Sequence, residues 1–278
     1  MPHIFAQIIH HPVSYKLGPL QFTGFGFAML LCFVIGQIIL QRELQNRGED
    51  PTPAGDMIFG AVVGGLLGAK IYYAILTHDM SSLWSRAGFV FWGGLIGGII
   101  GVIAVIKWKK MSVIHLMDPS AVALPAAYAI GRTGCWAVGD DYGRPWSGPL
   151  SVMFPHGAPP STAGNMSSMF GVQFPAATPP TEVIAVHPTQ IYEVMMGTIM
   201  FFIVLRFRKH NHAEGWLFGL YCFLAGLERF IVEFFRAKDD RFIGSITIAQ
   251  LIAIGFAMFG AIWMTARWSP RRSAVSAR

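Results

Sequence analysis

The stretch GFVFWGGLIGGIIGVIAVI, residues 88–106, contains no charged side chain. A helix of this length nearly crosses the roughly 30 Å of hydrocarbon in a bilayer, for which about 20 apolar residues are needed. Six further apolar stretches lie at residues 20–40, 54–76, 112–131, 190–207, 216–235 and 244–266. Because they are continuously apolar rather than alternating, they favour helices over a barrel. The sequence therefore predicts an all-α integral membrane protein, a bundle of seven transmembrane helices in one membrane domain over residues 1–278.

The composition of the whole chain agrees with a membrane location. Of the 278 residues, 53% are apolar and only 13% are Asp, Glu, Lys or Arg, about half of the roughly 25% usual in soluble domains. The net charge of +6 does not indicate a nucleic-acid partner, because twelve basic residues fall on one side of the predicted spans and seven on the other. The positive-inside rule places the richer side in the cytoplasm. We therefore expect the amino terminus outside and the carboxyl terminus in the cytoplasm.

The longest connection between predicted helices covers residues 135–188, and it is rich in Gly, Pro, Ser and Thr. It has no long apolar run, so it predicts an external loop or small head domain, and such long connections are more often functional than idle. The spacing of Cys32, Cys135 and Cys222 is not typical of a disulfide scaffold or a zinc site. No metal and no cofactor are expected.

Glycine recurs every fourth residue in two neighbouring apolar stretches. The positions are Gly60, Gly64 and Gly68 in the second stretch and Gly93, Gly97 and Gly101 in the third. Such ridges of small residues let helix backbones approach closely. We expect these two helices to pack directly against each other, and we assign the glycines to architecture rather than to ligand binding.

Ionisable side chains within or at the edges of the spans need a reason, because a charge at a helix centre costs about 2.5–3.5 kcal/mol on insertion scales. They are Lys70, Asp118, Arg132, Glu193, Glu228, Arg229, Glu233 and Arg236. Mutual salt bridges explain part of the set, since Arg229 and Glu233 are four residues apart on one helix. Arg132, Arg229 and Arg236 lie on the outward half with one or two carboxylate partners, which predicts spare positive charge. The rigid donor fork of arginine suits the phosphate oxygens of a phospholipid headgroup.

Two segments bring further polar groups to the same boundary. The segment GRTGCWAVGDDYG, residues 131–143, is expected to break the fourth helix with its four glycines and to deliver an arginine, a thiol and two carboxylates. The segment HPTQIYE, residues 187–193, re-enters the membrane with Gln190 and Glu193 on one helical face. A simple turn into the head domain is the competing interpretation of the first segment.

These segments carry a resemblance to a known family. Gly131-Arg132-x-Gly134 with Gly139-Asp140-x-x-Gly143, then His187-Pro188-x-Gln190-x-Tyr192-Glu193, then Arg229-Phe230-x-x-Glu233-Phe234-x-Arg236 closely resemble the motifs of the prolipoprotein diacylglyceryl transferases, in the same order and over nearly the whole chain. The resemblance implies a seven-helix bundle in the bacterial inner membrane with a periplasmic head. It implies transfer of a diacylglyceryl group from phosphatidylglycerol to the lipobox cysteine in the signal peptide of a prolipoprotein. Glycerol phosphate leaves and a thioether forms.

The resemblance also implies roles for individual residues. Arg132 resembles the headgroup-binding arginine of the glycine-rich signature, and Arg229 resembles the essential arginine of the sixth helix. Asp140 stands where the family usually has glutamate. The expected catalytic residues are Arg132, Arg229, Asp140 and His187, and the expected substrate-binding residues are Arg132, Arg229, Glu233, Arg236, Gln190, Tyr192, Glu193 and Gly143.

Three positions depart from the family pattern. Thr23 stands in place of a tyrosine, Trp92 in place of a histidine proposed as a base, and Cys135 in place of an asparagine. The base for the thiol would then be His187, Asp140, Asp141 or water. The departures leave two alternatives open, a lipid transferase with another acceptor and a non-catalytic phospholipid-binding pseudoenzyme. A transporter is disfavoured, because the sequence has no internal repeat.

Overall fold

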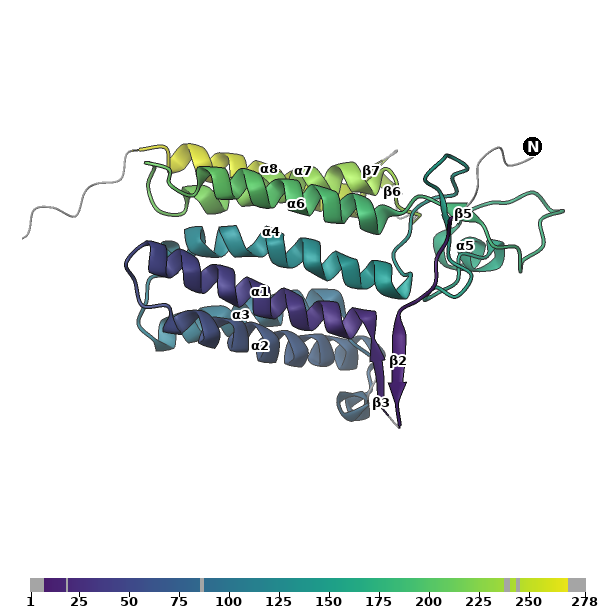
Figure 1. The fold of residues 1–278 in the computed structure, drawn as a ribbon, viewed down its shortest axis with the longest axis horizontal. Helices are drawn as coiled ribbons and strands as arrows, with labels where there is room; N and C mark the ends of the chain where they lie inside the picture. The colour runs from purple at the N-terminus through teal and green to yellow at the C-terminus, as the bar shows by residue number, and fades with distance from the viewer. Residues whose placement is uncertain (1–7, 19, 86–87, 238–240, 244–245, 270–278) are drawn as a thin grey trace, which may run out of the picture.

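The structure is a computed structural model that describes residues 8–18, 20–85, 88–237, 241–243 and 246–269. Its long helices lie alongside one another and form an elongated bundle (Figure 1). They are α1 (Gly24–Asn46), α2 (Thr52–Thr77), α3 (Phe91–Trp108), α4 (Val113–Val138), α6 (Thr189–Phe207), α7 (Trp216–Glu233) and α8 (Ile248–Ala266). The 3-10 helix η1 (Met80–Trp84) follows α2.

Six of these helices, α1, α2, α3, α4, α6 and α8, are long and apolar enough to cross a membrane. The predicted all-α integral membrane fold is confirmed to that extent. Helix α7 also has 18 residues, but these include Glu228, Arg229 and Glu233, and it is not among the six. Its charges gather near its carboxyl end, which is the end next to the candidate site.

Helices α2 and α3 pack along their glycine ridges, as predicted. A Cβ atom added at Gly64 or Gly68 would overlap the backbone carbonyl of Gly97 or Gly93 on the facing helix. A Cβ atom at Gly101 would likewise overlap the carbonyl of Gly60. The two backbones therefore touch, which gains van der Waals contact where lipid offers no hydrophobic driving force.

Helix α4 does not break at residue 131, so the predicted end of this helix is wrong. It continues past Pro119, Pro125, Gly131 and Gly134 to Val138. Gly134 is retained in the helix because its missing side chain lets α4 approach Phe25 and Ala28 of α1. The helix ends at Gly139, whose positive φ of 72° suits glycine at this left-handed cap. Arg132 and Cys135 therefore lie on a regular helix, one turn apart.

Helices α1 and α8 begin later than the apolar stretches predict, because a short strand precedes each of them. Residues Leu20–Thr23 form strand β3, which pairs antiparallel with β2 (Ser14–Leu17) in a hairpin, and Thr23 caps α1 by accepting from the Gly26 amide at 3.2 Å. Residues Ile246–Thr247 form β7, which pairs with β6 (Arg241–Ile243) before α8 begins. Hydropathy alone does not distinguish an apolar strand from the first turn of a helix.

The segment between α4 and α6 forms a small head at one end of the bundle (Figure 1). It contains helix α5 (Ala163–Phe170) and strands β4 (Val152–Met153) and β5 (Ala185–Val186), with β1 (Ile8–Ile9) pairing with β4 in parallel. Its core is made of Tyr142, Val152, Phe154, Met166, Val186 and Ala237. The carboxyl ends of α4 and α7 and the amino end of α6 meet where the bundle adjoins the head. The charged residues of the predicted site lie there.

Candidate active site

Arg132 is the first anchor of the site, near the carboxyl end of α4. Its Nη2 forms an ion pair with Glu193 of α6. Its Nη1 lies 3.0 Å from Oδ2 of Asp141 and donates to the Cys135 Sγ at 3.2 Å. One guanidinium thus ties together α4, the loop that follows it and α6.

Glu193 connects Arg132 with the other two arginines. Its Oε1 lies 3.8 Å from Arg229 Nη1 and 3.8 Å from Arg236 Nη1. Arg229 also pairs with Glu233 at 2.7 Å, and Arg236 Nη2 lies 3.0 Å from Oδ1 of Asp141. The three predicted arginines therefore belong to one network rather than to separate parts of the molecule. We call Arg132, Arg229, Arg236, Glu193, Glu233 and Asp141 the arginine network.

The expected spare positive charge is not present, and that expectation is wrong. Three carboxylates, Glu193, Glu233 and Asp141, pair with the three arginines. Only 2% of the Glu193 side chain and 1% of the Glu233 side chain are exposed, against 41% for Asp141. The sequence analysis expected only one or two carboxylate partners for the three arginines. It did not include Asp141, which contacts Arg236 only because α6 and α7 bring Arg236 back to the loop after α4.

Gln190 and Gly143 hold the site loop, and Gly143 also pairs with Arg236 in an isolated antiparallel β-bridge. The Gln190 amide donates to the carbonyl of Asp140 at 2.5 Å, and the Gly143 amide donates to the carbonyl of His187 at 2.8 Å. A side chain at Gly143 would overlap the carbonyl of Phe235 and the side chain of His187. These two residues therefore position Asp140 and Asp141 and fix the approach of the loop to α6.

His187 and Tyr192 face an apolar groove beside the arginine network. The His187 ring stacks on Trp146 with centroids 4.4 Å apart, and His187 Nδ1 lies 3.1 Å from the Tyr192 hydroxyl. Together with Met196, Ile231, Val232 and Phe235, these residues line a cavity of about 370 Å³. Burial lowers the pKa of His187. Within the part of the chain that the structure describes, His187 makes no hydrogen bond or ion pair to the network.

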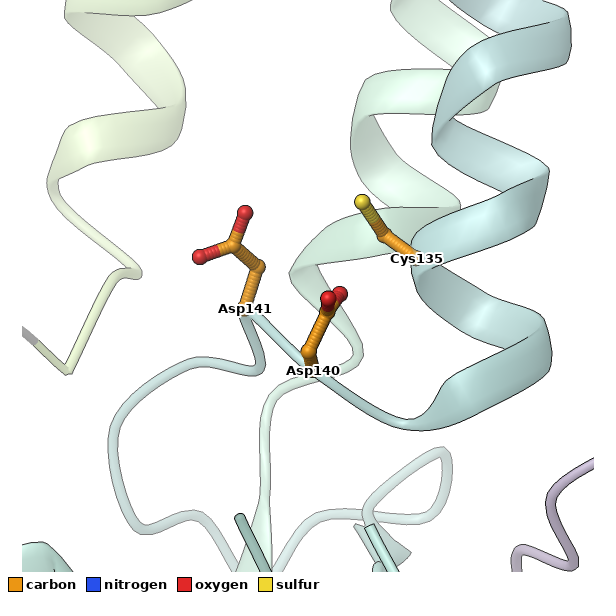
Figure 2. Close-up of side chains that lie close together, drawn as sticks. All are labelled: Cys135, Asp140 and Asp141. Atoms are coloured by element: carbon orange, nitrogen blue, oxygen red, sulfur yellow. The ribbon is translucent and has the colours of Figure 1, made fainter. Parts of the chain in front are cut away.

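Cys135, Asp140 and Asp141 point to the same side of the loop that follows α4 (Figure 2). Their possible ligand atoms all lie within 4.8 Å of one another, as in a metal site. However, Arg132 contacts both Cys135 and Asp141, and Arg236 takes the second oxygen of Asp141. Two guanidinium groups in contact with two of the three donors oppose the binding of a cation.

The two aspartates of this cluster titrate in opposite directions. Burial, together with the nearby charge of Asp141, raises the pKa of Asp140 to about 6. Burial also acts to raise the pKa of Asp141, but the charges of Arg236 and Arg132 outweigh it and hold that pKa below its usual range. Asp140 is therefore poised to exchange a proton near neutral pH, whereas Asp141 stays ionised.

Comparison with known proteins agrees with this geometry. The sequence profile of the family described as prolipoprotein diacylglyceryl transferase matches residues 12–266. The chain belongs to this family. The predicted resemblance is confirmed, and with it the transferase class. With its six apolar helices, the chain is a multi-pass protein of the bacterial inner membrane.

Similar proteins named phosphatidylglycerol–prolipoprotein diacylglyceryl transferase come from several bacteria. The Geobacter sulfurreducens protein is 30% identical over 274 residues, which cover 93% of this chain and 94% of that protein. The Clostridium tetani protein is 28% identical over 251 residues, covering 87% and 92%. The Aeromonas salmonicida protein is 26% identical over 280 residues, covering 95% and 92%. These matches give no support to another acceptor or to a pseudoenzyme.

The family departures lie in different surroundings. Cys135 is in the site and accepts a hydrogen bond from Arg132. Thr23 caps α1, and Trp92 lies in the first turn of α3 against the Phe91 ring, so neither contacts the arginine network within the described residues. This chain therefore has no histidine at position 92, where the family has the histidine proposed as a base.

The other in-span ionisable groups have structural partners. Lys70 donates to the Ser85 carbonyl at 2.6 Å, and Glu228 accepts from the Tyr128 hydroxyl at 2.9 Å. Asp118 accepts from the Leu217 amide at the start of α7 at 3.0 Å. None of these three side chains forms an ion pair with the network among the residues described.

Proposed function

We propose that this chain transfers the diacylglyceryl group of phosphatidylglycerol to the lipobox cysteine thiol of a prolipoprotein signal peptide, in line with the printed names of its relatives. The observation that carries the proposal is the arginine network. Arg132, Arg229 and Arg236 come from two helices and a loop, and they converge on Glu193 at the boundary between the bundle and the head. Guanidinium groups in this arrangement suit a phosphodiester, which offers several acceptor oxygens.

The groove next to the network supports a lipid as the donor. Tyr192 and Phe235 line the groove, and the residues that follow them in the chain, Glu193 and Arg236, belong to the network. A headgroup bound to the arginines would therefore have the apolar groove beside it, where an acyl chain could begin. Sites for small ligands commonly combine an apolar wall with a few polar groups that fix orientation.

The reaction requires a nucleophilic sulfur and a stabilised leaving group. The thiol sulfur attacks the carbon of the diacylglyceryl group that is bonded to the phosphate ester oxygen. A carbon–sulfur bond forms while the bond between this carbon and that oxygen breaks. Glycerol phosphate leaves with the bonding electron pair, and Arg132 and Arg229 stabilise its charge. Glu233 orients Arg229, and Arg236 offers a third guanidinium to the phosphate oxygens.

Asp140 is the best-placed group to accept the thiol proton. Its pKa of about 6 leaves it ionised at neutral pH, yet basic enough to take a proton. His187 faces the groove instead, and Asp141 is occupied by two arginines. A water molecule could carry the proton over the remaining distance to Asp140.

The orientation in the membrane belongs to the same proposal. We place α7 as a seventh span, the head and the amino terminus in the periplasm, and the carboxyl terminus in the cytoplasm. The basic clusters Lys107–Lys110 and Arg206–Lys209 support this orientation, since they lie at the carboxyl ends of α3 and α6, which point away from the head. A periplasmic head places the arginine network at the outer leaflet.

A direct transfer assay tests the proposed function. The purified chain in lipid nanodiscs is mixed with phosphatidylglycerol and a lipobox peptide, and glycerol phosphate and thioether-linked peptide are measured. We expect both products, with Arg132→Ala and Arg229→Ala each lowering turnover on the order of a hundredfold or more. Arg42→Ala removes an exposed arginine from α1, far along the bundle from the head, and should leave turnover unchanged.

The product pattern separates the proposal from its alternatives. Wild-type turnover in either site variant would refute the proposed role of these arginines in binding the phosphate. Glycerol phosphate without modified peptide would indicate another acceptor. Neither product, with lipid binding retained, would indicate a non-catalytic phospholipid-binding protein.

A further inference from the structure

The arginine network is electrically balanced before any lipid enters. Its three guanidinium groups already face three carboxylates. A phosphodiester brings one more negative charge to a site that is largely shielded from water, where repulsion between like charges is strong. Lipid binding therefore requires one carboxylate to give up its place on the arginines.

Asp141 is the carboxylate that is free to leave. Glu193 and Glu233 are enclosed by helices, with 2% and 1% of their side chains exposed, so no water is available to receive their charge. Asp141 lies on a loop with 41% of its side chain exposed. Rotation of this side chain would carry its charge into water at small desolvation cost.

The contacts of Asp141 are the ones that a phosphate would make. One carboxylate oxygen lies 3.0 Å from Arg132 and the other lies 3.0 Å from Arg236. The carboxylate thus bridges two arginines with two oxygens, as a phosphodiester does with its two non-bridging oxygens. The two anions compete for the same donors.

Two side chains of α6 hold the backbone of the loop through hydrogen bonds. The Thr189 hydroxyl donates to the carbonyl of Asp141 at 2.6 Å, and Gln190 donates to the carbonyl of Asp140. Asp141 has a φ of 55°, a left-handed conformation that Asp, Asn and Gly tolerate better than other residues. The exchange is therefore confined to side-chain rotation.

We propose that Asp141 occupies the place of the lipid phosphate on Arg132 and Arg236 and so limits the affinity for an anionic headgroup. This inference rests on the proposed binding of phosphatidylglycerol by the network. It assigns to Asp141 a role in donor binding and none in proton transfer. Headgroup entry and rotation of Asp141 toward water are one exchange step.

Binding of phosphatidylglycerol tests the exchange. A short-chain fluorescent phosphatidylglycerol is titrated into the purified full chain, and turnover with the lipobox peptide is measured in parallel. Asp141→Asn keeps the size and the left-handed backbone preference but removes the charge, so we expect Kd and KM for the lipid to fall on the order of tenfold. The kcat should stay within about twofold.

Matched variants keep the test decisive. Asp141→Gly removes the side chain at a position whose backbone favours glycine, and it should bind at least as tightly as Asp141→Asn. Asp141→Glu keeps the charge and should remain close to wild type. Glu182→Gln removes an exposed head carboxylate without an arginine partner among the described residues, and it should not change lipid affinity. Inorganic phosphate should inhibit Asp141→Asn at about tenfold lower concentration than it inhibits wild type, because the free anion uses the same donors.

The outcomes separate this inference from the proposed function. Unchanged or weaker lipid binding in both Asp141→Asn and Asp141→Gly, with wild-type binding and transfer intact, overturns the competition alone. Absence of lipid binding in wild type and in both variants overturns the proposed binding of phosphatidylglycerol by the arginine network. A fall in kcat at unchanged KM would make Asp141 part of the chemical step, which also contradicts the proposal.

Discussion

Asp140 is the residue whose ionisation we expect to control the pH dependence of transfer. Its pKa of about 6 lies above the usual range of aspartate, so the carboxyl is protonated below that pH and available as a base above it. The wild-type rate should therefore rise up to about pH 6 and then level off. In Asp140→Asn, the rate should be lower and keep rising about tenfold per pH unit toward the thiol pKa of about 8.5.

The measurement is a pH–rate profile for thioether formation at saturating lipid. Glu182→Gln serves as the control, since it removes a carboxylate from the surface of the head, and its profile should match wild type. Parallel profiles for wild type and Asp140→Asn would remove Asp140 from the role of base.

Cys135 tests whether a thiol of the chain takes part in the reaction. It is buried, and its sulfur accepts a hydrogen bond from Arg132 at 3.2 Å. We expect Cys135→Asn to retain activity, because an amide oxygen accepts the same hydrogen bond, and Cys135→Ala to lose less than about tenfold. Abolished transfer in both variants would assign the thiol a chemical role.

At the residue scale, the sequence identified most members of the network but not its balance. Arg132, Arg229, Glu233 and Arg236 were found because charges are rare in apolar spans. The role of Asp141 depends on the left-handed turn after Gly139 and on an arginine 95 residues away. Neither the turn nor that distant contact leaves a local pattern in the sequence.

At the scale of elements, the α2–α3 glycine ridge makes a sharp prediction. Gly97→Ala places a methyl group against the Gly64 carbonyl and should destabilise the chain by about 1–3 kcal/mol. Gly255→Ala in α8 meets no atom within 4 Å and should be neutral or slightly stabilising, because alanine favours helices. Thermal unfolding in detergent measures both. Equal effects of the two substitutions would contradict direct backbone contact.

Asp118 of α4 fixes the start of α7 and offers a second prediction for an element. It accepts from the Leu217 and Phe218 amides at 3.0 and 3.3 Å, and it lies 3.2 Å from Nε2 of His210. Asp118→Ala leaves these buried donors unpaired and should cost about 1–3 kcal/mol. Asp118→Asn keeps one acceptor and should cost less.

The control for Asp118 is Asp50, an exposed aspartate that accepts from the Thr52 amide at the start of α2. Asp50→Ala should shift the melting temperature less than Asp118→Ala, because water can replace an exposed acceptor. Since α7 carries Arg229 and Glu233, Asp118→Ala should also lower lipid binding. Unchanged stability would show that α7 does not depend on this contact.

The ends of the elements were harder to predict than their existence. Every predicted apolar stretch overlaps a long helix, since sustained apolarity is a strong signal. The end of α4 was misplaced because Gly131 and Gly134 predict a break when taken alone, whereas contact of Gly134 with α1 makes glycine favourable inside the helix. The start of α1 was misplaced because residues 20–23 pair with a preceding strand.

At the scale of the whole molecule, the number of spans decides which side each loop occupies. Six helices are apolar enough to cross on their own, and α7 carries three charges. Contacts at the ends of α7 and α8 bear on whether α7 crosses the membrane. The Ala213 amide, before α7, donates to the Arg267 and Ser269 carbonyls, after α8, at 3.2 and 2.9 Å. These contacts place the α6–α7 loop and the end of α8 together, as they would be if α7 and α8 each crossed once.

Single-cysteine labelling turns this contact into a prediction. Because Cys32, Cys135 and Cys222 are buried, cysteines introduced at the exposed positions 182, 209 and 269 should dominate the reaction with a membrane-impermeant maleimide. We expect Glu182→Cys to react in cells with a permeable outer membrane. Lys209→Cys and Ser269→Cys should react only after the inner membrane is disrupted. If positions 209 and 269 react from opposite sides, α7 does not cross, and the arginine network loses its place at the outer leaflet.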